Sequence, residues 1–276
     1  MGERAQKRAS GILTPIPEGS TKQETMMSLK GKSVIVTGGG SGIGRAAAIQ
    51  LATAGSSVTI GDVNEAGAAE TIALIEAAGG RAQFIRTSVA DEDQVIALVK
   101  ASLNAYGKLD GAINAAGVAQ KGQPLHLLTA ADFDRVHGIN LRGMFFCFKH
   151  QIAAMLDNGG GSIVAIGAIA GKNGVPNSSE YGAAKNGING LVRCAAIDYA
   201  SQNIRINAIL PGGTWTPMVQ GSLAKDPALQ GVVDSFPMKR FAQPEEISSA
   251  AVWLITDAAS YTTGACIPID GALSVI

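Results

Sequence analysis

The sequence predicts a single α/β domain, with a doubly wound parallel sheet of about seven strands and helices on both faces. Two observations predict this class. From residue 29 onward, short runs of β-branched and other apolar residues alternate with segments of helical periodicity. These runs are continuously apolar, which is typical of strands buried on both faces of a parallel sheet.

The first elements show the alternation most clearly. The β-branched run at 33–37 predicts a strand that leads into a glycine loop, and a helix is expected at 43–54. A second apolar run predicts a strand at 58–60. The helix after it extends to about residue 78, because Gly79-Gly80 is typical of a helix end.

The later elements continue the alternation to the end of the chain. Proline marks two boundaries, since Pro244 suits a first helical turn and Pro211-Gly-Gly213 stops a strand. The remaining strands are expected at 83–85, 109–113, 162–166, 204–210 and 267–269. The remaining helices are expected at 91–106, 132–157, 179–199 and 244–256.

Composition favours one globular domain with a short segment in front of it. The chain has 276 residues, of which 46% are hydrophobic and 16% charged, so a large core can form. No second core or linker is evident after residue 28, so we expect residues 28–276 to form one domain. Residues 1–27 show no apolar period and are expected to be a flexible extension; a targeting peptide, a tag or a subunit-packing arm are the alternatives.

Charge, hydropathy and cysteine usage argue against several function classes. The formal net charge is zero, so no nucleic-acid partner is expected, and no apolar run approaches the roughly 20 residues that span a membrane. Three scattered cysteines indicate a reducing compartment, which we take to be the cytoplasm. The three histidines lack metal-ligand spacing, so no metal site is expected.

A glycine loop, Thr37-Gly-Gly-Gly-Ser-Gly-Ile-Gly44, follows the first strand and opens the first helix. In that context, backbone N–H groups and a helix N-terminus can hold a pyrophosphate. Asp62, eighteen residues later, ends the second strand, where a carboxylate can accept hydrogen bonds from ribose hydroxyls and repel a 2′-phosphate. Because Ser41 and Val63 are neutral, although Arg45 lies nearby, NAD is favoured over NADP. A tight turn and a helix N-cap remain the alternatives for the loop and for Asp62.

Tyr181 and Lys185 stand four residues apart in a predicted helix, which places them on one face. A phenol has a pKa of about 10, and a nearby cation favours the phenolate and lowers that value. The pair can therefore serve as a general acid/base for an alcohol or a carbonyl. Upstream, Asn114-Ala-Ala-Gly117 ends a strand with small residues that let a flat cofactor come close. Each of these features, taken alone, is also compatible with a structural role.

Five motifs in this order and spacing resemble the short-chain dehydrogenase/reductase family, from about Leu29 to the C-terminus. They are the loop 37–44, the turn 114–117, Asn140 in Ile139-Asn-Leu, the Tyr181/Lys185 pair and the segment 211–218. The resemblance implies a Rossmann-like fold and hydride transfer between NAD(H) and a secondary alcohol/ketone pair. It also implies that Tyr181 exchanges the proton, that Lys185 binds the nicotinamide ribose and lowers the tyrosine pKa, and that Asn140 holds a relay water.

The resemblance further implies a set of cofactor-binding residues at the carboxyl ends of the strands. Thr214 and Thr216 are expected at the nicotinamide, and Ser88 stands where the family often has an Asp that contacts the adenine. The whole set is Gly38, Ser41, Gly42, Ile43, Gly44, Asp62, Val63, Val89, Asn114, Ala115, Gly117, Tyr181, Lys185, Pro211, Gly212, Thr214 and Thr216.

One position departs from the family pattern. The family has a catalytic Ser thirteen residues before the Tyr, and this chain has Ala168 there. A methyl cannot donate to the substrate oxygen, and loss of one such donor lowers the rate by roughly 10²–10³. Ala168 is either a deliberate Ser-to-Ala change or a natural residue, with Asn, Thr or water as the donor. The alternative function is a catalytically weakened NAD-binding sensor or scaffold.

The loops above the strands are expected to select the substrate, a medium-sized and partly apolar alcohol or ketone. The candidate substrate residues are Ala168, Gln120, Asn173 and Trp215. By the same resemblance, the helix at 179–199 and the helix before it are expected to pair across a subunit interface. The expected assembly is a homotetramer or a homodimer.

Overall fold

The structure is a computed structural model that describes residues 27–225 and 227–275. Its centre is a seven-stranded sheet with the order β3-β2-β1-β4-β5-β6-β7, in which neighbouring strands are parallel. The strands are β1 (Ser33–Thr37), β2 (Ser57–Asp62), β3 (Arg81–Arg86), β4 (Gly111–Asn114), β5 (Gly161–Ile166), β6 (Ile204–Pro211) and β7 (Cys266–Ile269). The chain builds outward from β1 to β3 and then returns to the other side of β1, which confirms the doubly wound prediction.

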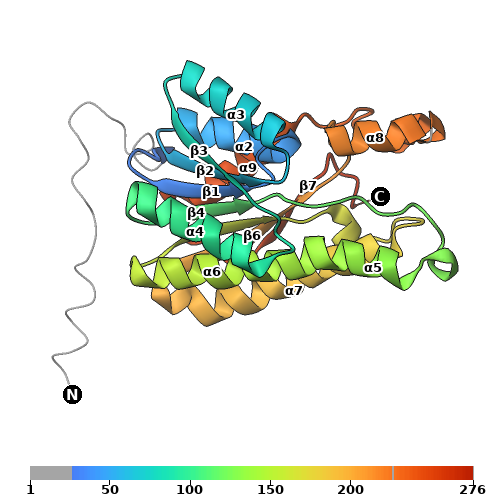
Figure 1. Cartoon of the computed structure of the whole chain (residues 1–276). Helices are drawn as coiled ribbons and strands as arrows, with labels where there is room; N and C mark the ends of the chain where they lie inside the picture. Colours follow the sequence, from blue (N-terminus) through green and yellow to red (C-terminus); the bar gives the residue numbers. More distant parts are fainter. Residues whose placement is uncertain (1–26, 226, 276) are drawn as a thin grey trace.

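Helices cover both faces of the sheet (Figure 1). They are α2 (Gly42–Thr53), α3 (Glu65–Ala77), α4 (Glu92–Tyr106), α5 (Ala130–His137), α6 (Gly143–Asp157), α7 (Ser179–Tyr199), α8 (Pro217–Lys225) and α9 (Pro244–Ile255). The side chains of β1 alternate: Val34 and Val36 join a core with residues of α2 and α9, whereas Ile35 joins a core with residues of α4, α6 and α7. The sheet therefore separates two buried cores, as continuously apolar strands predict.

The helix expected at 132–157 is corrected by the structure, because a π-helical turn, Gly138–Arg142, separates α5 from α6. In this turn the N–H of Gly143 donates to the carbonyl of Gly138, one residue beyond the α-helical spacing. Gly143 also packs on the backbone of Val89, where an added Cβ would lie only 3.0 Å from the Val89 carbonyl oxygen. Apolar periodicity continues through the turn, so it cannot be seen in the sequence pattern.

Side-chain caps fix where several helices begin. Asn64 accepts a hydrogen bond from the N–H of Gly67 at the start of α3, and Asp91 accepts from two N–H groups at the start of α4. Thr129 and Asp132 form a capping box that begins α5. Gly107 ends α4 in the left-handed region with φ 78°, which glycine adopts without strain. Because α2, α3 and α4 each follow a parallel strand, the loops before these helices lie at the same edge of the sheet.

The remaining differences from the expected elements are small. The expected boundaries hold to within about two residues, with shifts of this size at the start of β4, which is Gly111 instead of 109, and at the ends of β2 and β3, which are both longer than expected. The strand–helix alternation does not predict α8 or the 3₁₀ turn Pro227–Ser235 that follows it. The extension expected at 1–27 lies outside the described residues, except for Met27. In the part of the chain that the structure describes, no helix combines the length and the apolarity that a membrane crossing requires.

Candidate active site

A cleft of about 360 Å³ opens at the carboxyl ends of the central strands, where the chain order reverses between β1 and β4. Ligands of doubly wound sheets bind at such a switch point. The residues of the cofactor set that line this cleft are Gly38, Ser41, Gly42, Ile43, Gly44, Asp62, Val63, Val89, Ala115, Gly117, Tyr181, Lys185, Pro211, Gly212, Thr214 and Thr216. The sequence thus brings together segments that lie up to 178 residues apart, from Gly38 to Thr216.

Asn114 is the one residue of the expected cofactor set that does not line the cleft. It is 1% exposed, and its amide exchanges two hydrogen bonds with the amide of Gln151 on α6, at 2.8 and 2.9 Å. Both donor and acceptor of the amide are therefore used within the protein. Asn114 holds the end of β4 to α6.

The structure separates the four substrate candidates. Ala168 lines the cleft, whereas Gln120, Asn173 and Trp215 do not. Gln120 is exposed on the loop after β4, and Trp215 packs against Phe241 with ring centroids 5.5 Å apart. The lining residues that the candidate sets omit are Thr87, Ser88, Ala116, Val118, Ile139, Ile166, Gly167, Pro217, Met218 and Val219. A sequence signal existed for Met218, which ends the 211–218 motif, and for Val118, which follows Gly117 directly.

The glycine loop comes too close to other backbone to accept side chains. A Cβ on Gly44 would lie 2.1 Å from the carbonyl oxygen of Gly38, and a Cβ on Gly38 would lie 2.7 Å from the nitrogen of Ala116. Gly38 also has φ 72°, in the left-handed region. Bare backbone therefore faces the cleft at the start of α2, which suits a pyrophosphate that binds N–H groups and a helix N-terminus.

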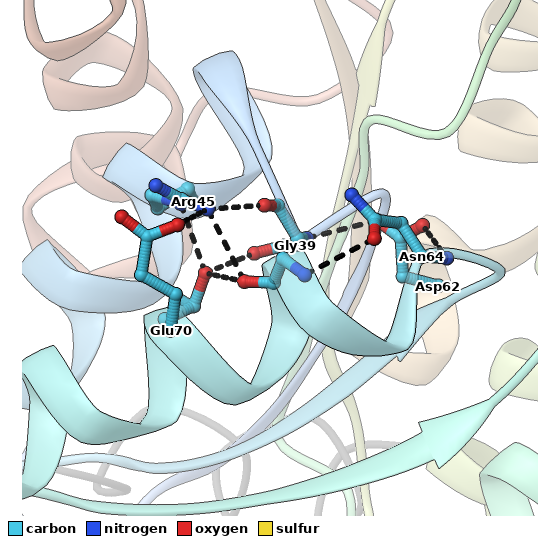
Figure 2. A network of polar contacts seen from close by, with 8 residues as sticks. Gly39, Arg45, Asp62, Asn64 and Glu70 are labelled. Carbon is cyan, nitrogen blue, oxygen red and sulfur yellow. Dashed lines mark hydrogen bonds and ion pairs between the residues drawn. The ribbon is translucent and has the colours of Figure 1, made fainter.

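Asp62 lines the cleft, and two backbone N–H groups hold its carboxylate in a fixed orientation (Figure 2). Its Oδ2 accepts a hydrogen bond from the N–H of Gly40 at 2.8 Å, and its Oδ1 accepts from the N–H of Asn64 at 2.9 Å. A carboxylate oxygen has a second lone pair, so both oxygens can still accept from vicinal hydroxyls such as those of a ribose. Among the described residues that line the cleft, Lys185 is the single cation, so no basic side chain accompanies Asp62.

Lys185 and Tyr181 share the cleft, with the lysine Nζ 5.5 Å from the centroid of the tyrosine ring. The Nζ donates to the carbonyl of Ile166 at 2.9 Å, and Lys185 is only 5% exposed. Burial lowers the pKa of Lys185 to about 8 and raises the pKa of Tyr181 to about 12. This direction is opposite to the expected lowering of the tyrosine pKa, and its cause is the removal of the phenol from water.

Asn140 lies in the π-helical turn, is 1% exposed, and does not line the cleft, unlike its neighbour Ile139. Its Oδ1 accepts from the N–H of Val118 at 2.8 Å, and its Nδ2 donates to the carbonyl of Val118 at 2.9 Å. A Cβ on Gly117 would lie 3.1 Å from Asn140 Oδ1 and 3.9 Å from the Nζ of Lys185. The side chain of Asn140 thus fixes the strand exit beside the lysine, and its part in a water relay stays a prediction.

Ala168 brings a methyl group to the position where the resemblance expects a hydroxyl. It follows β5 in extended backbone with φ −168° and ψ 156°, and it is 9% exposed. Ser162 does not replace the hydroxyl, because its Oγ donates to the carbonyl of Leu254 at 2.8 Å. Ser178 donates to the carbonyl of Pro176 at 3.1 Å. Neither serine lines the cleft.

Comparisons with known proteins show which family the chain is similar to. The family model described as enoyl-(acyl carrier protein) reductase matches residues 38–274. A 2,5-dichloro-2,5-cyclohexadiene-1,4-diol dehydrogenase of Sphingobium indicum is 45% identical over 254 residues, which cover 91% of this chain and 100% of the relative. A cis-4-hydroxycyclohexanecarboxylate dehydrogenase of Sinomonas cyclohexanicum is 42% identical over 242 residues, which cover 88% of this chain and 96% of the relative.

Solved structures show the same relationship. The crystal structure of levodione reductase superposes with a TM-score of 0.87 and 37% identity, covering 89% of this chain and 98% of that one. The matched region includes the glycine loop, the Tyr181/Lys185 pair and the strands that join them. The chain therefore belongs to the short-chain dehydrogenase/reductase family.

Proposed function

We propose that this protein is an NAD-dependent dehydrogenase/reductase that interconverts a secondary alcohol and a ketone on a six-membered alicyclic ring. The observation that carries the proposal is one cleft that contains both Asp62 and the Tyr181/Lys185 pair. Relatives named for cyclohexadiene-diol and hydroxycyclohexane substrates support the ring. The apolar side chains of Val118, Met218 and Val219 on the cleft wall suit such a ring.

Asp62 supports NAD as the cofactor. A 2′-phosphate beside this carboxylate would meet a like charge, with no cation on the same part of the cleft wall to offset it. Bound NAD(H) would supply the hydride acceptor or donor. The chain's own residues bind and orient: the glycine loop offers backbone N–H groups, Asp62 accepts from ribose hydroxyls, and Lys185 offers two further N–H donors beside its bond to Ile166.

Tyr181 is the proposed proton donor and acceptor at the substrate oxygen. With a pKa raised to about 12 by burial, the phenol is protonated at neutral pH and ready to donate to a ketone oxygen. Oxidation of an alcohol requires the reverse transfer. The fraction of phenolate increases as pH rises, so we expect the oxidation rate to increase with pH while ketone reduction declines.

Ala168 supports a second candidate, a protein that binds NAD as a sensor or scaffold with weakened chemistry. The missing hydroxyl leaves the substrate oxygen with one donor fewer, which lowers turnover by about 10²–10³ in comparable sites. Binding of the cofactor does not depend on that hydroxyl. The two candidates therefore differ in turnover and agree in cofactor binding.

The test is an assay of cyclohexanol, cis-4-hydroxycyclohexanecarboxylate and a linear secondary alcohol with NAD⁺ and with NADP⁺. We expect the ring alcohols to be oxidised with NAD⁺, and Tyr181→Phe to lose that activity while it keeps NADH binding. Faster turnover with NADP⁺ would overturn the cofactor proposal. No turnover by either the protein or Ala168→Ser, together with tight NADH binding, would favour the sensor.

We further propose that residues 28–276 act as one domain in a cytoplasmic homotetramer or homodimer. Large apolar side chains are exposed on α6 and α7, at Phe145, Leu156 and Ile197. Such side chains on neighbouring helices favour burial against another subunit. Light scattering on a size-exclusion column measures the mass, and a monomer at micromolar concentration would contradict this assembly.

A further inference from the structure

We infer that Arg45 is a positioning residue that sets the preference for NAD over NADP from behind the glycine loop. This inference rests on the proposed use of NAD. Arg45 does not line the active-site cleft, so its guanidinium does not contact a ligand there. It acts through the backbone of the loop and through the carboxylate of Asp62.

The guanidinium of Arg45 joins the glycine loop to α3 (Figure 2). Its Nη2 donates to the carbonyl of Gly40 at 2.7 Å and to the carbonyl of Gly67 at 3.2 Å. The same nitrogen donates to Oε2 of Glu70 at 2.7 Å, and Nε donates to the hydroxyl of Thr71 at 3.1 Å. One side chain therefore bonds four groups on the loop and on α3.

Thr71 holds the neighbouring peptide of the loop. It is fully buried, and its hydroxyl lies 2.9 Å from the carbonyl oxygen of Gly39 and 3.0 Å from that of Gly67. A hydroxyl has one proton, so these two carbonyls share it. Arg45 and Thr71 thus bind two consecutive carbonyls, those of Gly39 and Gly40, from the side of α3.

Because the peptide group is planar and trans, fixing the direction of a carbonyl also fixes the direction of the N–H in the same peptide group. The C=O and N–H of one trans peptide point in opposite directions. With the carbonyl of Gly39 turned to α3, the N–H of Gly40 points the other way and donates to Asp62 at 2.8 Å. By the same geometry, the bond from Arg45 to the carbonyl of Gly40 turns the N–H of Ser41 toward the cleft, which Ser41 lines.

Arg45 also keeps its own charge out of the cleft. Glu70 pairs with it at 2.7 Å on the outer face of the loop, and the Arg45 side chain is only 24% exposed. The arginine that a 2′-phosphate could attract is thereby neutralised and held away. The carboxylate of Asp62, fixed by Gly40 and Asn64, meets the ribose instead. Loosening Arg45 should therefore weaken NADH more than NADPH.

The experiment compares Arg45→Gln, Arg45→Lys and Thr71→Val with the parent protein in fluorescence titrations of NADH and of NADPH. For Arg45→Gln we expect the Kd of NADH to rise by about tenfold and that of NADPH by less than about twofold. Because the reacting groups are untouched, kcat at saturating NADH should stay within about twofold. Arg45→Lys keeps a donor and the charge, so it should restore part of the NADH affinity, and Thr71→Val should show a smaller shift in the same direction.

The control is Lys149→Gln, which removes another cation that pairs with a carboxylate of a neighbouring helix, Glu92, at 2.8 Å. Neither of these residues lines the cleft, so both cofactor affinities should be unchanged. An equal loss of NADH and NADPH affinity in Arg45→Gln and in Thr71→Val, or a fall in melting temperature alone, overturns the role of Arg45. If the parent protein prefers NADPH, that result contradicts the proposed cofactor. The change in the ratio of NADH to NADPH affinity from the parent to each variant still tests the role of Arg45.

Discussion

Two parts of the cleft differ in how completely the protein hydrogen-bonds its own polar groups: the part around Asp62, proposed to bind the adenosine (the adenosine part), and the part around Tyr181, proposed to carry the reaction (the reacting part). Both oxygens of Asp62 accept backbone N–H groups, and the loop beside it is held by Arg45 and Thr71. The reacting part has the methyl of Ala168 and a phenol whose pKa burial raises to about 12. In the proposed function, the groups that would bind the cofactor are thus already held in place, whereas proton transfer would start from a phenol kept neutral by burial, with one hydroxyl fewer nearby.

The largest expected effect comes from supplying the hydroxyl that the reacting part lacks. Ala168→Ser places a hydroxyl on the cleft wall, and we expect kcat/KM for a ring alcohol to rise by about 10²–10³. The Kd of NADH should stay within about twofold, because Ala168 follows β5, two strands away from β1 and the glycine loop. Steady-state kinetics and NADH titration measure the two quantities.

The matched control for that substitution is Ala170→Ser, the same chemical change two residues further along and outside the cleft lining. It should leave kcat/KM unchanged. If Ala168→Ser gains no more than Ala170→Ser, the reacting part does not lack a donor, and another group already supplies it.

The second effect concerns the free energy of unfolding. Burial lowers the pKa of Lys185 from 10.5 to about 8, so between these pH values the unfolded chain binds more protons than the folded chain. Stability from this group therefore increases as pH rises through that window. Lys185→Met lacks the group, so the stability of the parent relative to this variant should rise by about 3 kcal/mol from pH 8 to pH 10.5.

Urea denaturation of both proteins at several pH values, without cofactor, measures this change. Tyr181 contributes little to the difference, because its pKa of about 12 lies above this pH window. Parallel stability curves for the parent and Lys185→Met would show that the folded protein does not desolvate the ammonium. The ammonium of Lys185 would then be as well compensated by its surroundings as the carboxylate of Asp62 is by its two N–H partners.

The smallest of these effects is the loss of stability when the side chain of Asn140 no longer binds Val118. Asn140→Ala leaves the N–H and the carbonyl of Val118 without their partner, which should lower the free energy of unfolding by about 2 kcal/mol. Asn140→Asp keeps an acceptor for the N–H and should lose less. Urea titration gives both values, and equal losses in the two variants would contradict a role for the amide acceptor.

The fold was predictable from the sequence because strand–helix alternation and continuously apolar runs depend on residues close together in the chain. The cleft lining was largely predictable as well, since the glycine loop, Asp62 and the Tyr181/Lys185 pair each follow a predicted strand or occupy a predicted helix. The pairing of Asn114 with Gln151 was not, because Asn114 ends a strand and its partner lies 37 residues away on a helix. The raised pKa of Tyr181 was not predictable either, because it depends on how many atoms surround the phenol.

The π-helical turn at Gly138–Arg142 makes the helical run from α5 to α6 one residue longer than regular α-helical geometry needs. Successive residues of an α-helix are offset by about 100° around its axis, so this one residue sets the rotation of everything after it. It lets Asn140 face Val118 while Phe148 faces the sheet. A single deletion within the turn would restore α-helical spacing and would turn either the amide of Asn140 away from Val118 or the apolar face of α6 away from the core.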